Sequence, residues 1–156
     1  LWAVANGVTN GTGAASFSPN SAVSRAQMVT FLWRAHGSPK ATGVNPFTDV
    51  RASDYCYDAV LWAVANGVTN GTGTASFSPD IDVTRAQAVA FQWRAAGSPA
   101  ASGSSFDDVP ADAYYRNAVT WAVANGITNG TGSNRFSPAA VVSRAQAVTF
   151  LYREQV

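Results

Sequence analysis

Trp2-Ala3-Val4-Ala5-Asn6-Gly7 is a string that the chain repeats without change at residues 62–67 and 121–126. Three other strings follow it in a fixed order, and each recurs after about 60 residues. They are Thr-Asn-Gly-Thr-Gly from residues 9, 69 and 128, Phe-Ser-Pro from residues 17, 77 and 136, and Arg-Ala-Gln from residues 25, 85 and 144. Self-similarity at one period is typical of repeat architectures, so the 156 residues comprise three copies of one unit.

Connectors rich in Gly, Ser, Pro and Ala separate the units. The units cover residues 1–36, 47–96 and 106–156. The second and third units open with Phe-Xaa-Asp-Val, at residues 47–50 and 106–109, followed by tyrosines. The first unit has no such opening, because Leu1 already lies in a segment that is helical in pattern. We therefore expect the first unit to be incomplete and the chain to be a fragment or a processed product.

Each unit predicts two helices joined by a long loop. In the second unit, apolar residues at helical spacing predict a helix over about residues 57–65, which Asn66-Gly67 ends. A second helix opens at Thr84 and ends at Gly97, before a proline. Two short helices cannot bury their apolar faces alone. We therefore expect an all-α fold, mainly helical with long loops, in which three helix-loop-helix repeats close into a pseudo-threefold bundle; an open solenoid is the competing arrangement.

Composition excludes several classes of function. Charged residues make up 12% of the chain and the formal net charge is +1, whereas nucleic-acid binding needs a clustered cationic surface. No apolar stretch reaches the length of a membrane span, so we expect no membrane insertion. Cys56 is the only cysteine, which rules out an internal disulfide, and its neighbours Tyr55 and Tyr57 favour a buried thiol.

Catalysis has little support in the sequence. His36 is the only histidine, and it lies outside the repeated strings. No second histidine is present to form a metal cluster, and nothing marks a nucleophile that His36 would activate. The aspartates at turns and helix starts resemble caps; they are Asp49, Asp107, Asp108 and Asp112. We expect no catalytic residues, no metal site and no cofactor.

The start of the second helix in each unit carries the most chemistry. Its Ser/Thr-Xaa-Xaa-Gln pattern predicts a capping box, in which the hydroxyl and the Gln side chain each accept a backbone N–H. The cap residues are Ser24, Thr84 and Ser143, and their glutamines are Gln27, Gln87 and Gln146. Helix stability alone would not select the arginine that follows each cap, because the positive end of the helix dipole opposes it. These arginines are Arg25, Arg85 and Arg144.

Two interpretations of these arginines stay open from physical argument alone. A guanidinium beside exposed backbone N–H groups at a helix start makes a good site for a carboxylate or phosphate. In the alternative, each arginine pairs with an aspartate of an adjacent unit, such as Asp49, Asp107 or Asp108, and ties the bundle together.

Two other repeated features have structural interpretations. Most of the aromatic rings at helical spacing indicate core positions, with one ring per groove exposed for contact with sugars. They are Trp2, Trp62 and Trp121 in the first helices and Trp33, Trp93 and Tyr152 in the second. The Asn-Gly-Thr triplets at Asn10, Asn70 and Asn129 match a glycosylation acceptor, but a repeated turn with a left-handed asparagine explains them better.

The order of these motifs resembles the S-layer homology domain. Phe-Xaa-Asp-Val is followed by an Ala-Val-Xaa-Trp-Ala helix, a Gly-rich loop to Phe-Ser-Pro, and Thr-Arg-Ala-Gln or Ser-Arg-Ala-Gln. The resemblance covers almost the whole chain. It implies a pseudo-trimer with a central helical bundle and grooves between units. Proteins of this family attach exported bacterial proteins to the envelope by binding secondary cell-wall polysaccharide, often pyruvylated, or peptidoglycan-linked polymer.

The resemblance implies an extracellular, non-catalytic anchoring module at the cell wall or S-layer. Arg25, Arg85 and Arg144 match the arginine of the family's Thr-Arg-Ala-Glu motif, which lines the groove. Here Gln replaces the usual Glu, which keeps the capping box but removes a negative charge. The alternative function is a self-assembling S-layer or filament subunit whose partners are copies of itself or other S-layer proteins. Low charge and an incomplete first unit suit that alternative.

Overall fold

A computed structural model describes all residues from 1 to 156 and contains six helices and no strand. The helices are α1 (Trp2–Ala5), α2 (Arg25–Ala35), α3 (Tyr57–Ala65), α4 (Arg85–Ala95), α5 (Arg116–Ala124) and α6 (Arg144–Gln155). The predicted all-α class is therefore confirmed, and the two helices expected in the second unit correspond to α3 and α4.

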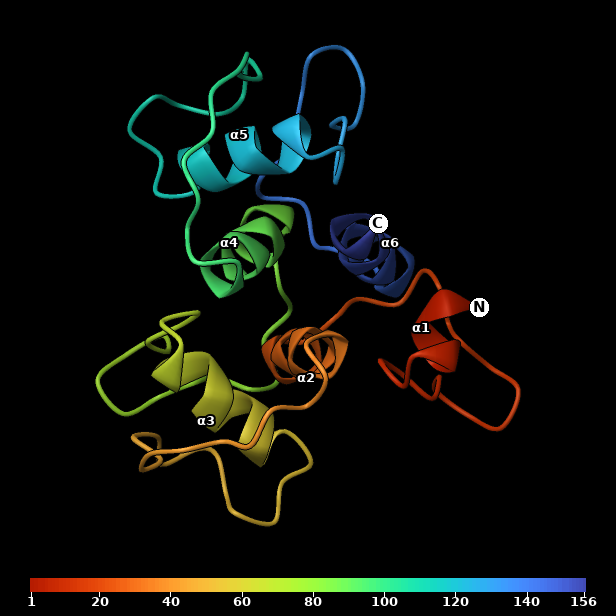
Figure 1. The fold of residues 1–156 in the computed structure, drawn as a ribbon, viewed down its shortest axis with the longest axis vertical. Coiled ribbons are helices and arrows are strands. Elements are labelled where there is room, and N and C mark those ends of the chain that lie inside the picture. Colours follow the sequence, from red (N-terminus) through yellow and green to blue (C-terminus); the bar gives the residue numbers. More distant parts are fainter.

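The six helices form a closed ring of three units (Figure 1). The second helices, α2, α4 and α6, lie together at the centre, and α1, α3 and α5 lie outside them. Each outer helix packs against the central helix of the preceding unit: α3 against α2, α5 against α4, and α1 against α6. The contact between α1 and α6 joins the first unit to the last. This closure excludes the open solenoid.

Three buried valines close the ring at its axis. The backbone N–H of Val23 donates to the carbonyl of Val142, Val142 donates to Val83, and Val83 donates to Val23, over 3.2, 2.9 and 2.8 Å. All three side chains are fully buried. A cyclic set of hydrogen bonds between residues about 60 positions apart can form only if all three units are present. The units therefore share one core rather than folding as separate beads.

Local sequence explains where the helices begin and end. All three central helices have the predicted capping box, with the Ser or Thr hydroxyl and the Gln side chain each accepting a backbone N–H. The outer helices end at the predicted glycine; Gly67, for example, has φ of +67°. The predicted left-handed asparagine is wrong. Asn70 does not have positive φ, and its neighbour Gly71 does, at +88°, because glycine pays no steric cost there.

Candidate ligand-binding grooves

The arginine at the start of each central helix reaches into the next unit. The Nε of Arg25 donates to the carbonyl oxygen of Phe77 over 2.8 Å, and its Nη2 donates to Oγ1 of Thr69 over 3.3 Å. Its guanidinium carbon lies 4.9 Å from the ring centroid of Phe77 and 5.4 Å from that of Phe91. Arg85 makes the same contacts with Phe136, Thr128 and Phe150, and Arg144 makes them with Phe17, Thr9 and Phe31. The three arginines thus tie the ring together.

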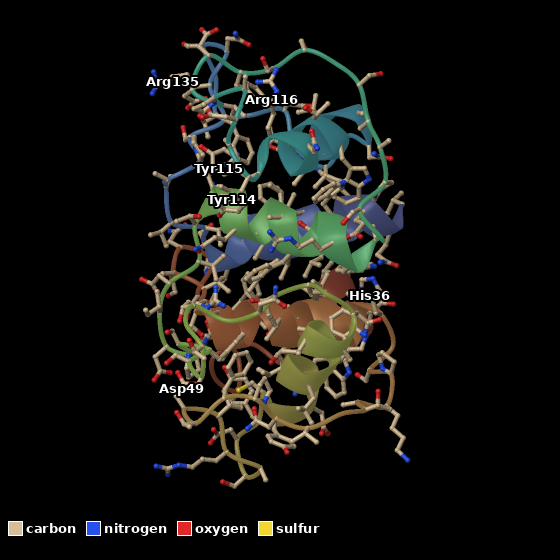
Figure 2. The ribbon with its side chains drawn as sticks, turned by 90° about the vertical axis from the view of Figure 1, so that its left-hand side faces the viewer. His36, Asp49, Tyr114, Tyr115, Arg116 and Arg135 are labelled. Carbon is tan, nitrogen blue, oxygen red and sulfur yellow. The ribbon has the colours of Figure 1, made fainter.

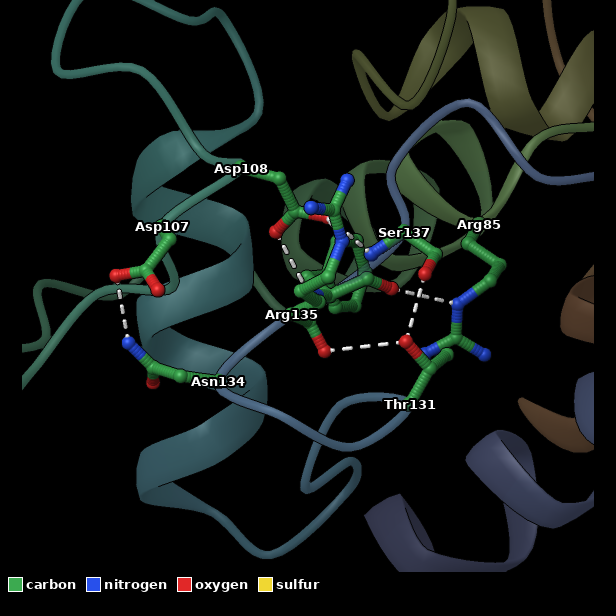
Figure 3. A network of polar contacts seen from close by, with 8 residues as sticks. Arg85, Asp107, Asp108, Thr131, Asn134, Arg135 and Ser137 are labelled. Atoms are coloured by element: carbon green, nitrogen blue, oxygen red, sulfur yellow. Dashed lines mark hydrogen bonds and ion pairs between the residues drawn. The ribbon is translucent and has the colours of Figure 1, made fainter.

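The alternative interpretation, in which these arginines form ion pairs with aspartates, is wrong. The only ion pair in the structure joins Nε of Arg135 to Oδ2 of Asp108, over 3.6 Å. Asp49 and Asp108 instead accept backbone N–H groups; the two oxygens of Asp108 accept from Phe136 and Ser137, each over 2.8 Å (Figure 3). Arg85 binds the carbonyl of the same Phe-Ser-Pro loop. The backbone of the loop therefore lies between the carboxylate and the guanidinium.

The sequence indicated that Asp49 and Asp108 are helix caps, but their carboxylates instead hold a strained loop by accepting its N–H groups. Ser78, which precedes a proline, has φ of +58°, a conformation that side chains rarely adopt. Its N–H donates to Asp49 over 2.8 Å, and its hydroxyl lies 2.5 Å from that of Thr72. Partial burial raises the pKa of Asp49, but the N–H groups of Phe77 and Ser78 outweigh this and hold it below its usual value.

Backbone donors at the helix starts are already used. The N–H groups of Arg25 and Ala26 donate to the carbonyls of Ile81 and Pro79 in the second unit, and Gln27 donates to the Ser24 hydroxyl. The two other central helices repeat this arrangement. The first backbone N–H groups of the central helices are therefore not free to donate to a ligand. Contact of a ligand with the capping Ser, Thr and Gln side chains stays a prediction.

A groove opens instead beside Arg25, and another opens beside Arg85. The Arg25 groove has a volume of about 300 Å³. It is lined by Arg25, Thr69, Asn70, Gly71, Thr72, Gln87, Ala90, Phe91, Arg94 and Tyr114. Only 3% of Arg25 is exposed, so this residue forms the floor. Its Nη1 has no acceptor in the protein and is not fully enclosed, which leaves N–H donors for a ligand.

All three units contribute to the Arg25 groove. The first supplies Arg25, the second supplies the loop from Thr69 to Thr72 and helix α4, and the third supplies Tyr114. Figure 2 shows Tyr114 beside Tyr115 on one side of the molecule and His36 on the opposite side. Tyr114 is 58% exposed. Partial burial raises the pKa of its hydroxyl, and the nearby guanidinium of Arg94 partly offsets this rise.

The second such cavity, the Arg85 groove, has a volume of about 410 Å³. It is lined by Arg85, Thr128, Asn129, Gly130, Ala145, Gln146, Thr149, Phe150 and Arg153. No tyrosine lines it. Around Arg144 the corresponding tyrosine is Tyr55, which lies close to Arg34. Neither groove cavity has a carboxylate among its lining residues, and each has two guanidiniums.

Sequence reasoning missed two classes of groove residue. Arg94 and Arg153 lie in the last turns of the central helices, where the sequence indicated only a favourable interaction with the helix dipole. Tyr114 was identified only as part of the repeat. Their recurrence once per unit was the available signal. The expectation for the tryptophans holds for Trp62 and Trp121, each 6% exposed, whereas Trp2, Trp33 and Trp93 are half-buried. Tyr152 is 44% exposed, and Cys56 is buried as expected.

The three units form a closed ring, and a cationic groove lies beside Arg25 and another beside Arg85. These features define the chain as one closed module of tandem helical repeats. It belongs to the S-layer homology domain family, which it matches over residues 1–29, 46–89 and 105–148. Membership of this family makes the chain an extracellular module of the bacterial cell surface. No helix has the length and apolar character needed to cross a membrane, and no three His, Cys, Asp or Glu side chains lie where they could hold a metal ion.

Several relatives share this module. A cell surface protein of Thermoanaerobacter kivui is 33% identical over 114 residues, which span 69% of this chain and 15% of that protein. A surface-layer 125 kDa protein of Lysinibacillus sphaericus is 32% identical over 111 residues, or 71% of this chain and 9% of that protein. An amylopullulanase of Thermoanaerobacterium thermosulfurigenes is 27% identical over 143 residues, or 87% of this chain and 8% of that enzyme. The chain thus corresponds to a small part of each relative.

Proposed function

We propose that this module anchors the protein that carries it to the bacterial cell wall, by binding an anionic wall polysaccharide in the Arg25 groove and the Arg85 groove. The charge of the grooves carries this proposal, since each is lined by two guanidiniums and by no carboxylate. An anion entering such a groove meets N–H donors and no repulsion. The module has no catalytic role in this proposal.

The other lining groups suit a sugar. The amides of Asn70 and Gln87 offer donors and acceptors for hydroxyl and acetamido groups, and the exposed ring of Tyr114 offers a face for an apolar sugar surface. A carboxylate on the sugar, such as a pyruvyl ketal adds, would accept from Nη1 of Arg25 and from Arg94. In this proposal Arg25 and Arg85 bind the anion from the groove floor, while the capping boxes hold the helices that carry them.

Co-sedimentation with purified peptidoglycan sacculi tests this proposal. The test uses sacculi with their polysaccharide, without it, and with its pyruvyl groups removed. The wild type is compared with Arg94→Gln/Arg153→Gln, which removes one cation from each groove but leaves the buried arginines in place. Arg51→Gln/Arg135→Gln changes the net charge equally at exposed residues outside both grooves and is the matched control.

We expect the wild type and the control to bind only sacculi that carry the polysaccharide. The groove variant should bind at least about tenfold more weakly, because charge-assisted hydrogen bonds contribute about 1.5–3 kcal/mol each. Equal loss in the groove variant and the control would show that attraction is diffuse and that the grooves are not the site. No binding by the wild type would contradict anchoring and favour the self-assembling subunit.

A further inference from the structure

Six asparagines of the chain are followed directly by glycine, and the structure divides them into two classes. Three are the C-caps of the outer helices, at Asn6, Asn66 and Asn125, and three lie in the loops that follow, at Asn10, Asn70 and Asn129. All six are exposed. Exposure to water therefore does not separate the two classes, whereas their hydrogen bonds and their surroundings do.

The helix-capping asparagines have their side-chain amides held by the fold. The Nδ2 of Asn66 donates to the carbonyl oxygen of Trp62 over 2.8 Å, and the two other capping asparagines make the equivalent bond over 2.9 and 2.8 Å. The next peptide N–H is held as well, since that of Gly67 donates to the carbonyl of Val64 over 3.1 Å. An attack of the glycine nitrogen on the side-chain carbonyl carbon would therefore have to break two hydrogen bonds.

The loop asparagines have free side-chain amides. The amide of Asn70 makes no hydrogen bond in the protein, and neither does that of Asn129. Only the next peptide N–H is held, since that of Gly71 donates to Oγ1 of Thr69 over 3.0 Å. Gly71 has φ of +88°, and a Cβ atom at this position would clash with the carbonyl oxygen of Ser76. The fold therefore requires glycine here, the neighbour that obstructs such an attack least.

Charge separates the two classes in the same direction. Attack by a peptide nitrogen requires the loss of its proton and builds negative charge on the side-chain oxygen. At Asn70 this charge develops in the Arg25 groove, which the guanidiniums of Arg25 and Arg94 line, and the Arg85 groove gives Asn129 equivalent surroundings. At Asn66 it develops at the C-terminus of α3, where the helix dipole is negative. The grooves therefore favour the attack, and the helix ends oppose it.

We propose that Asn70 and Asn129 are sites of spontaneous deamidation, and that the product limits how long the two grooves bind an anion. The main-chain nitrogen of Gly71 bonds to Cγ of Asn70, the Cγ–Nδ2 bond breaks, and ammonia leaves with the proton of the peptide N–H. Water then opens the cyclic imide at one of its two carbonyls and leaves an aspartyl or an isoaspartyl residue. Either product places a carboxylate among the guanidiniums. The modification sites stand on the structure alone, whereas their effect on binding rests on the proposed function.

Mass spectrometry of the aged chain tests the chemistry without any ligand. The folded chain and the chain unfolded in guanidinium chloride are incubated side by side in mildly alkaline buffer and digested, and fragmentation assigns each deamidation to its residue. In the folded chain the two groove asparagines should convert about fivefold or more faster than Asn66 and Asn125, because a side-chain hydrogen bond holds each of the slower pair. In the unfolded chain the four rates should agree, since each asparagine precedes glycine. Equal rates in the folded chain, or no conversion of Asn70 there, would overturn the proposal.

Co-sedimentation with polysaccharide-bearing sacculi tests the effect on the grooves. Asn70→Asp/Asn129→Asp should bind about tenfold more weakly than the fresh wild type, because each new carboxylate pairs with a guanidinium and repels an anion, and the aged wild type should approach it. Asn70→Gln/Asn129→Gln keeps the amides but does not readily form the five-membered ring, so its binding should survive ageing. Thr74→Asp/Ser133→Asp adds the same charge at exposed positions outside both grooves and is the matched control.

The outcomes separate the two parts of the proposal. Equal loss of binding in Thr74→Asp/Ser133→Asp and in Asn70→Asp/Asn129→Asp would overturn the effect on the grooves, because net charge alone would explain it. An aged wild type that is deamidated at Asn70 and binds as well as the fresh chain would also overturn that effect. A wild type that deamidates at the groove asparagines but never binds sacculi would contradict the proposed function and leave the modification sites established.

Discussion

Replacing Arg25 by alanine should unfold the ring more easily, whether or not a ligand is present. The variant loses a 2.8 Å hydrogen bond to the carbonyl of Phe77, a longer one to Thr69, and two contacts with aromatic rings. Phe77 is fully buried, so no water readily replaces the guanidinium at its carbonyl. A charge-assisted hydrogen bond contributes about 1.5–3 kcal/mol, and an orphaned buried acceptor costs about 1–3 kcal/mol. Each cation–π contact adds about 0.5–2 kcal/mol.

Part of this loss is offset. Burial lowers the pKa of Arg25, which shows that the protein disfavours its charge to some extent, and alanine removes that penalty. We therefore expect a net loss of about 3 kcal/mol, or a fall of about 6–12 °C in the midpoint of thermal unfolding for a chain of this size. Differential scanning calorimetry measures it, with exposed Arg51→Ala as the control. Arg144→Ala should cost less, because its partner Phe17 is only half-buried. A midpoint within 2 °C of the wild type for Arg25→Ala would refute the structural role.

Two further predictions concern other polar side chains. Gln92 is fully buried; its Oε1 has no hydrogen-bond partner, and its Nε2 donates to Glu154 over 2.8 Å. Because Gln92→Leu/Glu154→Ala removes these buried polar groups, we expect the double variant to be about 2 kcal/mol more stable in urea unfolding at pH 7. Burial raises the pKa of Glu154. A carboxyl with a raised pKa stabilises the fold below its unfolded pKa of about 4 and loses that contribution as the pH rises. The stability gained by the double variant should therefore be smaller at pH 4 than at pH 7. Gln87→Glu keeps a capping box but adds a negative charge to the Arg25 groove, so co-sedimentation should show weaker binding while calorimetry shows equal or higher stability. Weaker binding that simply follows lost stability would contradict the last prediction.

The repeated strings predicted the fold because they contain its local rules. The capping boxes, the glycine stops and the apolar spacing are short-range features. Each recurs in successive units, so the assignment of a helix in one unit is supported by the same pattern in the others. Closure also followed, since two short helices per unit need neighbours on both sides.

The site was less predictable because its contacts cross between units. Nothing local to Arg25 shows that its partner is the backbone carbonyl of Phe77, 52 residues away. A guanidinium near aspartates suggests an ion pair, yet here a loop backbone separates the two charges. Side-chain chemistry can be read from the sequence, whereas a main-chain acceptor carries no residue type and stays hidden until the fold is known.

The geometry of the guanidinium explains how one residue can hold the ring and also form a groove floor. Arginine has five N–H donors in a rigid plane, and the fold uses Nε and Nη2 on one side. Nη1 therefore remains without an acceptor in the protein, with its direction fixed by the same bonds that tie the units together. Lysine could not divide its donors in this way, because its ammonium is a point charge on a flexible stem. The buried arginine is thus a pre-organised donor, and loss of stability in Arg25→Ala does not argue against its binding an anion.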